Sequence, residues 1–117
     1  MRIYHNTRCS KSREVLEIIK SRTNNFEIIE YLKKPLKYKE IKLLLKKLNI
    51  EPIKLIREKE SIWKENYKEK KMTKNEIINT IIKHPILMER PIIEMNKTAI
   101  IGRPVENALC LFNQEGI

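Results

Sequence analysis

The sequence has little glycine, little cysteine and no long apolar run, and each shortage excludes a class of protein. Glycine occurs only at Gly102 and Gly116, so no glycine-rich loop is present to cradle nucleotide phosphates. Cys9 and Cys110 are too few for the disulfide framework of a small secreted domain. Charged residues interrupt every apolar stretch before the roughly 18 residues of a membrane span, and the N-terminus lacks the apolar block of a signal peptide. We therefore expect a cytoplasmic protein with reduced thiols and no membrane contact.

The composition supports one folded domain with a basic surface. Hydrophobic residues form 41% and charged residues 34% of the 117 residues, which is enough apolar material for one core over residues 1–117. Lys and Arg outnumber Asp and Glu by 25 to 15, which gives a net charge of +10. The lysine-rich stretches have few aromatic residues for base stacking and contain no nucleic-acid-binding motif. A nucleic-acid-binding module is therefore a weaker interpretation than an enzyme.

The first third of the chain has the pattern of a strand, a helix and a second strand. Residues 2–5 and 26–31 are typical of strands, and between them Val15, Leu16 and Ile19 follow helical spacing. A helix between two strands at this distance predicts a βαβ unit with parallel strands.

The rest of the chain predicts a helical block, then a hairpin and a last helix. Thr73 and Glu76 form a capping-box pattern before one of these helices. The fold class is therefore α/β, a mixed sheet with a helical insertion at about 37–84 between βαβ and ββα halves. The predicted elements are helices over 37–48, 52–57, 60–67 and 73–84, hairpin strands over 92–94 and 98–101, and a helix over 105–112.

Cys9 has the surroundings of a reactive thiol. It follows the first strand and begins the first helix, so unpaired amides and the positive end of the helix dipole point toward its sulfur. Arg8, Lys11 and Arg13 add positive charge, and the hydroxyl of Ser12 lies one helical turn away. Ser12 also stands where a Cys-x-x-Cys motif has its second cysteine, so no disulfide can form within this motif.

Cys110 is predicted to be an inert packing residue. It lies in the middle of the last helix, beside Leu109, Leu111 and Phe112. Cysteines in apolar surroundings behave as small hydrophobic side chains with unreactive thiols.

Three arginines stand out in a chain that takes most of its positive charge from lysine. Arg57, Arg90 and Arg103 each lie at the end of a predicted element or before a proline. Arginine suits an oxyanion, because its planar fork donates paired hydrogen bonds without losing its charge. His5 and His84 are far apart and no Cys/His cluster has ligand spacing, so we expect no metal site.

These motifs together resemble one protein family. The segment His5-Asn6-Thr7-Arg8-Cys9-Ser10-Lys11-Ser12-Arg13 resembles the His-Asn-Pro-x-Cys-x-x-Ser-Arg active-site loop of the glutaredoxin-linked arsenate reductases, the ArsC family. Further family blocks match in the right order over nearly the whole chain. They are EYLK at 30–33, LIR at 55–57, HPILMERPI at 84–92 and IGRP at 101–104.

The resemblance implies a thioredoxin-like fold and an oxidoreductase that reduces arsenate to arsenite. Cys9 takes the place of the nucleophile, and Arg57, Arg90 and Arg103 match the arginines that bind the oxyanion. Glutathione is the implied co-substrate and glutaredoxin the implied partner, with no bound cofactor. The supporting residues that the resemblance implies are His5, Asn6, Ser12, Arg13 and Pro91, the last matching the cis-proline of thioredoxin-like folds.

One departure and two alternatives accompany this resemblance. Thr7 stands where the family usually has proline, which predicts a less rigid loop. One alternative is an Spx-like transcriptional regulator that binds RNA polymerase, and the other is a glutathione-dependent thiol reductase of another substrate. Ser12 breaks the Cys-x-x-Cys pattern of many Spx-like proteins, and Arg103–Pro104 fits the reductase branch better. Arsenate reduction is therefore the function that we expect.

Overall fold

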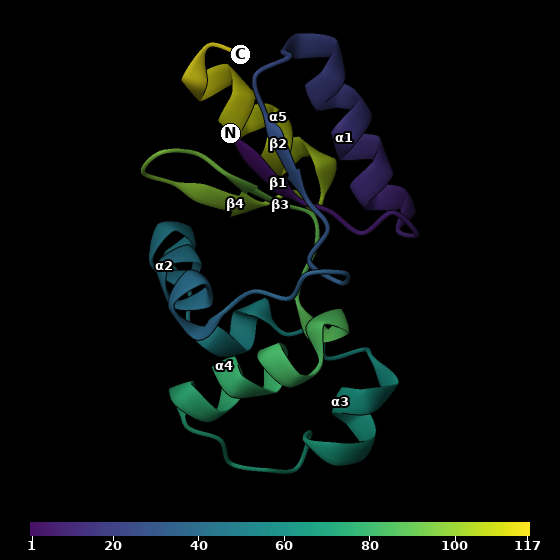
Figure 1. Ribbon diagram of the computed structural model, residues 1–117, viewed down its shortest axis with the longest axis vertical. Helices are drawn as coiled ribbons and strands as arrows, with labels where there is room; N and C mark the ends of the chain where they lie inside the picture. Colours follow the sequence, from purple (N-terminus) through teal and green to yellow (C-terminus); the bar gives the residue numbers. More distant parts are fainter. The chain divides into compact units, whose positions relative to one another are not determined.

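Residues 1–34 and 90–117 together form one unit of the computed structural model, which describes residues 1–117 (Figure 1). We call it the sheet unit. Residues 35–89 form the second unit, the helical unit. No helix in either unit combines the length and hydropathy that crossing a bilayer requires.

The sheet unit contains a four-stranded mixed sheet with the order β2-β1-β3-β4. β1 (Arg2–Tyr4) pairs in parallel with β2 (Glu27–Ile29), which confirms the predicted βαβ unit. β3 (Ile92–Glu94) and β4 (Ala99–Ile101) form the predicted antiparallel hairpin, and β3 also pairs antiparallel with β1. The mixed sheet of the predicted thioredoxin-like fold is therefore confirmed.

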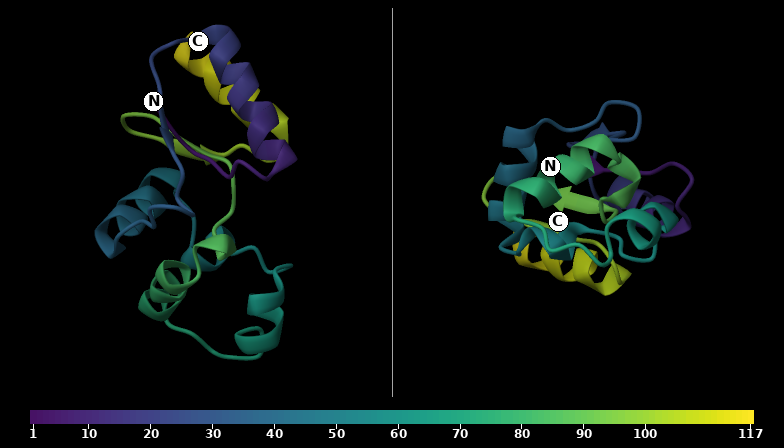
Figure 2. Two further views of the ribbon diagram at one scale, coloured as in Figure 1. Left: turned by 45° about the vertical axis from the view of Figure 1, so that its right-hand side comes forward. Right: turned by 90° about the horizontal axis from the view of Figure 1, so that it is seen from below.

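Two helices pack side by side on one face of this sheet, α1 (Ser10–Arg22) and α5 (Val105–Glu115) (Figure 2). Side chains alternate between the two faces of a strand, so one residue of each central strand points toward these helices. The two helices and the two central strands share one hydrophobic core, so the beginnings of α1 and α5 are fixed relative to each other. The buried core residues are Ile3, Ile93, Val15, Leu16, Ile19, Ala108, Leu111 and Phe112.

Cys110 is exposed, so the prediction that it is a packing residue of the last helix is wrong. The side chains of α5 that face the core are Ala108, Leu111 and Phe112. Residues three and four apart share a face of a helix, whereas residues two apart point in nearly opposite directions. Cys110 follows Ala108 by two positions and therefore faces solvent, although both of its neighbours in sequence are apolar.

The helical unit contains α2 (Tyr38–Leu48), η1 (Pro52–Leu55), α3 (Ser61–Asn66), α4 (Lys74–Lys83) and η2 (Pro85–Leu87). The predicted capping box of α4 is present. The Glu76 amide donates to Thr73 Oγ1 at 3.2 Å, and the Thr73 amide donates to Glu76 Oε1 at 2.9 Å. Each bond satisfies an amide that the first helical turn would otherwise leave unpaired, which fixes the start of this helix.

Candidate active site

The loop that joins β1 to α1 is closed by hydrogen bonds that Asn6 accepts. The carbonyl of Asn6 accepts from the Cys9 amide at 3.1 Å, and its side-chain Oδ1 accepts from the Arg8 amide at 3.0 Å. His5 extends the pairing of the sheet, because its amide donates to the Ile29 carbonyl at 2.9 Å. The side chain of Asn6 thus supports a loop that has neither glycine nor the family's proline. The lower rigidity expected from Thr7 stays a prediction.

Cys9 is the N-cap residue of α1, and its thiol is partly buried. Burial alone would raise the pKa of this thiol. The backbone amide of Ser12, the hydrogen bond and charge of Arg90, and the backbone amide of Lys11 outweigh burial and hold the pKa of Cys9 below its ordinary value. A helix start and a nearby arginine are the conditions that favour a thiolate. The predicted depression of the pKa of Cys9 therefore has a structural cause in the sheet unit.

Arg90 and Arg103 both reach the sulfur of Cys9. Arg103 donates from Nη1 to Cys9 Sγ at 3.8 Å, and Arg90 forms the hydrogen bond that favours the thiolate. Arg90 is 8% exposed and Arg103 is partly exposed, so their guanidinium groups act in surroundings less polar than water. Two guanidinium groups beside one thiolate form a site that attracts an anion to the nucleophile.

Ser12 acts on the loop through its hydroxyl and on the sulfur through its amide. Its Oγ accepts from the Asn6 amide at 3.1 Å and shares a hydrogen bond of 2.6 Å with Nδ1 of His5. All three of these residues are buried. Burial lowers the pKa of His5, with smaller contributions from Lys20 and Arg13 and an opposing one from Glu30, so the ring is neutral at pH 7. His5 therefore orders the loop through Ser12 and supplies no positive charge at this pH.

The remaining predicted site residues occupy different parts of the chain. Arg13 donates from Nη1 to the Thr7 carbonyl at 3.4 Å, so its side chain supports the loop. The Arg90–Pro91 peptide bond is cis, as the resemblance implied, and Arg103–Pro104 is cis as well. Arg57 belongs to the helical unit, where its Nη1 lies 3.1 Å from Oε1 of Glu60. A role for Arg57 beside Cys9 stays a prediction.

Two residues that the sequence analysis did not single out hold the segment that carries Arg103. Nδ2 of Asn107, in the first turn of α5, donates to the carbonyls of Ile101 and Arg103, each at 3.3 Å. The Gly102 amide donates to the Pro91 carbonyl at 2.8 Å and so joins the two Arg-Pro segments. A side chain at Gly102 would be crowded, because a Cβ there would lie 3.2 Å from Cγ of Pro91 and the proline ring would have to shift by a few tenths of an ångström. The only sequence signal for Asn107 is its place four residues after Arg103.

Comparisons with known proteins agree with this geometry. The model of the ArsC family matches residues 4–110. A protein of Escherichia coli (strain K12) described as uncharacterized protein YfgD is 40% identical over 111 residues, which cover 93% of each chain. An arsenate reductase of Neisseria meningitidis is 35% identical over 92% of this chain and 93% of its own length. The solved structure of an arsenate reductase from Vibrio cholerae has a TM-score of 0.87 at 35% identity, over 93% of this chain and 96% of that one.

Proposed function

Because the chain belongs to the ArsC family, we propose that it reduces arsenate to arsenite with Cys9 as its nucleophile and glutathione and glutaredoxin as its reductants. The observation that carries the proposal is the Cys9 thiol, which has a lowered pKa and lies beside the guanidinium groups of Arg90 and Arg103. A thiolate is the nucleophilic form of cysteine, and paired guanidinium donors suit a tetrahedral oxyanion.

In the first step the Cys9 thiolate attacks arsenic, and an arsenic–oxygen bond breaks as that oxygen leaves as water after taking up protons. Arg90 and Arg103 stabilise the negative charge on the remaining oxygens. The glutathione thiol then displaces a second oxygen as water and becomes bonded to arsenic. A glutaredoxin thiol attacks the glutathione sulfur, so two thiols become one mixed disulfide while arsenic(V) becomes arsenic(III). Water then hydrolyses the bond between arsenic and the Cys9 sulfur, so its oxygen is carried away in arsenite and its proton restores the Cys9 thiol.

The cysteines of the chain favour an external thiol over an internal one as the reductant. Ser12 stands where a Cys-x-x-Cys motif would have its second thiol, and its hydroxyl is engaged by His5 and Asn6. Cys110 is an exposed residue in the middle of α5. A mechanism that reduces an internal disulfide with thioredoxin needs a second cysteine that reaches Cys9, whereas the glutaredoxin route needs Cys9 alone.

The test is arsenate turnover with two reducing systems, glutathione plus glutaredoxin and thioredoxin plus its reductase. We expect turnover only with glutathione and glutaredoxin. Cys9→Ser should abolish it, and the matched variant Cys110→Ser should keep most of it. Without glutathione, one arsenic should remain bound to each protein that carries Cys9. Turnover that depends on thioredoxin and is lost in Cys110→Ser would contradict the proposed reductant, and the absence of turnover with either system would contradict arsenate as the substrate.

A further inference from the structure

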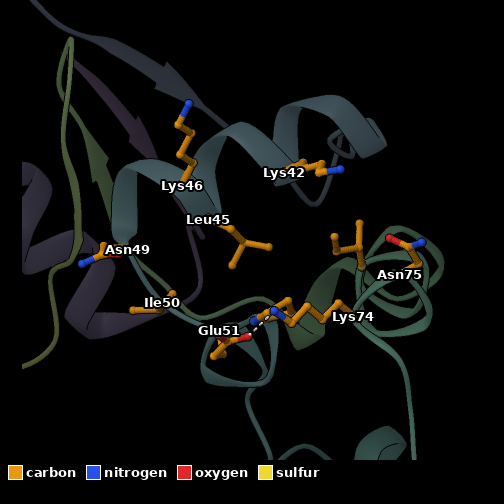
Figure 3. Close-up of a pocket in the computed structure, with 10 residues that line it drawn as sticks. Lys42, Leu45, Lys46, Asn49, Ile50, Glu51, Lys74 and Asn75 are labelled. Carbon is orange, nitrogen blue, oxygen red and sulfur yellow. Dashed lines mark ion pairs between the residues drawn. The ribbon is translucent and has the colours of Figure 1, made fainter.

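The helical unit contains a pocket of about 440 Å³, where the end of α2, the start of η1 and the first turn of α4 meet (Figure 3). All of its lining residues belong to residues 35–89, so none of them comes from the segments that carry Cys9, Arg90 or Arg103. The volume lies in the range of sites for small molecules.

The floor of this pocket is aliphatic. Leu45 from α2, Pro52 from η1 and Ile78 from α4 are buried, and Ile50 is half-buried. Figure 3 shows the side chain of Leu45 pointing from α2 into the space between α2 and α4. No aromatic side chain lines the pocket. Such a floor favours the removal of an aliphatic chain from water rather than stacking of a planar ring.

The rim is basic, and part of its charge has no carboxylate partner. Lys74 is paired with Glu51, at 3.2 Å between Nζ and Oε2. Lys42 and Lys46 lie one turn apart on α2, and neither ammonium has a carboxylate oxygen within 4.0 Å. The one carboxylate that lines the pocket is already engaged, so the rim attracts an anion and repels a cation.

A neutral donor adds to these charges. The hydroxyl of Tyr38 donates to Oδ1 of Asn75, which leaves the amide nitrogen of Asn75 free of that bond and able to donate at the rim. The ammonium of Lys42 lies 5.9 Å from the centre of the Tyr38 ring, which keeps the stem of this lysine near α2. Donors on α2 and α4 thus lie beside an aliphatic floor.

We propose that this pocket binds a small amphiphilic carboxylate, an unbranched fatty-acid anion whose chain covers Leu45, Ile50 and Ile78 and whose carboxylate faces Lys42 and Lys46. The alkyl chain of the ligand supplies affinity through burial of apolar surface, and each methylene strengthens binding roughly fourfold. Each lysine contact is exposed and contributes a factor of about two. Affinity therefore needs both parts of the ligand.

The binding test uses three soluble ligands, hexanoate, 1-hexanol and acetate, and follows backbone amide shifts by nuclear magnetic resonance. We expect hexanoate to shift the amides of Ile50, Glu51 and Asn75 in a saturable way and to bind about fourfold more tightly than 1-hexanol. Octanoate should bind about sixteenfold more tightly than hexanoate, and acetate should cause no saturable shift. Equal affinity for hexanoate and 1-hexanol, or the same shifts with acetate, would overturn the proposal.

Two pairs of lysine variants distinguish binding in the pocket from general attraction of an anion to a basic surface. Lys42→Gln/Lys46→Gln should weaken the binding of hexanoate about fourfold and leave that of 1-hexanol unchanged. The matched control is Lys39→Gln/Lys54→Gln, which removes two exposed lysines of the same unit outside the pocket and should bind hexanoate normally. A control pair that weakens hexanoate as much as the rim pair would refute the assignment. Thermal unfolding should be unchanged in both pairs, and Cys9→Ser should bind hexanoate as the parent does.

Discussion

Arg90→Gln should raise the pKa of the Cys9 thiol by about one unit. The substitution removes a hydrogen bond to the thiolate and a positive charge, and leaves the backbone amides of Lys11 and Ser12 in place. A hydrogen bond to a charged group contributes about 1.5–3 kcal/mol, and one pKa unit corresponds to about 1.4 kcal/mol, so the bond could account for about one to two units. The thiol is only partly buried, and solvent screening therefore favours the lower end.

The assay is the rate of alkylation by iodoacetamide across a range of pH, in a Cys110→Ser background with one thiol. The midpoint of the Arg90→Gln profile should lie about one unit higher than that of the parent. At pH values below both midpoints the thiolate fraction falls about tenfold, but each thiolate becomes about threefold more nucleophilic as its pKa rises. The net rate should therefore fall only about three- to fourfold there, and the high-pH plateau should rise about threefold.

Lys11→Gln is the matched control, because it removes an exposed positive charge next to Cys9 and keeps the Lys11 amide. Its midpoint should move by much less than that of Arg90→Gln, since an exposed charge is screened. Equal shifts in the two variants would show that general positive charge sets the pKa. An unchanged midpoint in Arg90→Gln, with thermal unfolding showing a folded protein, would refute the role of this arginine.

Three further predictions concern the same site. The pKa of Cys9 is lower in the folded protein than its ordinary value of 9.0, so folding is favoured when the thiol is ionised. The unfolding free energy of the parent, measured by urea unfolding relative to Cys9→Ser, should therefore rise as the pH passes through the lowered pKa. It should level off above about pH 9. Asn107→Leu should lower kcat/KM for arsenate about tenfold and move the alkylation midpoint of Cys9 less than Arg90→Gln does, because it frees the Arg103 backbone but spares Arg90 and the amides at Cys9. Gly102→Ala should lower the unfolding free energy by about 1 kcal/mol, because its Cβ meets Pro91, and an unchanged melting temperature would contradict this.

The local elements were predictable because each leaves its own pattern in the sequence. The apolar spacing over 37–48 and the Thr73–Glu76 capping box predicted α2 and α4, and both are present. The two short runs typical of strands, at 92–94 and 98–101, predicted the hairpin of β3 and β4. These signals depend on residues within one helical turn or one tight connection, so the sequence contains all the information that they need.

The direction in which single side chains point was less predictable. The apolar neighbours of Cys110 predicted that it lies in the core. The rotation of α5 about its own axis is set by its contact with α1 and the sheet, which turns Leu111 inward and Cys110 outward. The sequence spacing places the hydroxyl of Ser12 one helical turn from the sulfur. In the structure the hydroxyl is taken by His5 and Asn6, and the backbone amide of Ser12 acts on the thiol.

The assembly of the site depends on contacts between segments about 80 to 95 positions apart in the sequence. Cys9 begins α1, whereas Arg103 lies just before α5, and spacing rules say nothing about such a distance. The shared hydrophobic core brings these segments together. Because α1 and α5 bury their apolar faces against each other and the same two strands, the positions of their first turns are coupled through close packing. The distance between the nucleophile and Arg103 is therefore a property of the core, and a cavity at Phe112 should loosen the site although Phe112 itself touches no substrate.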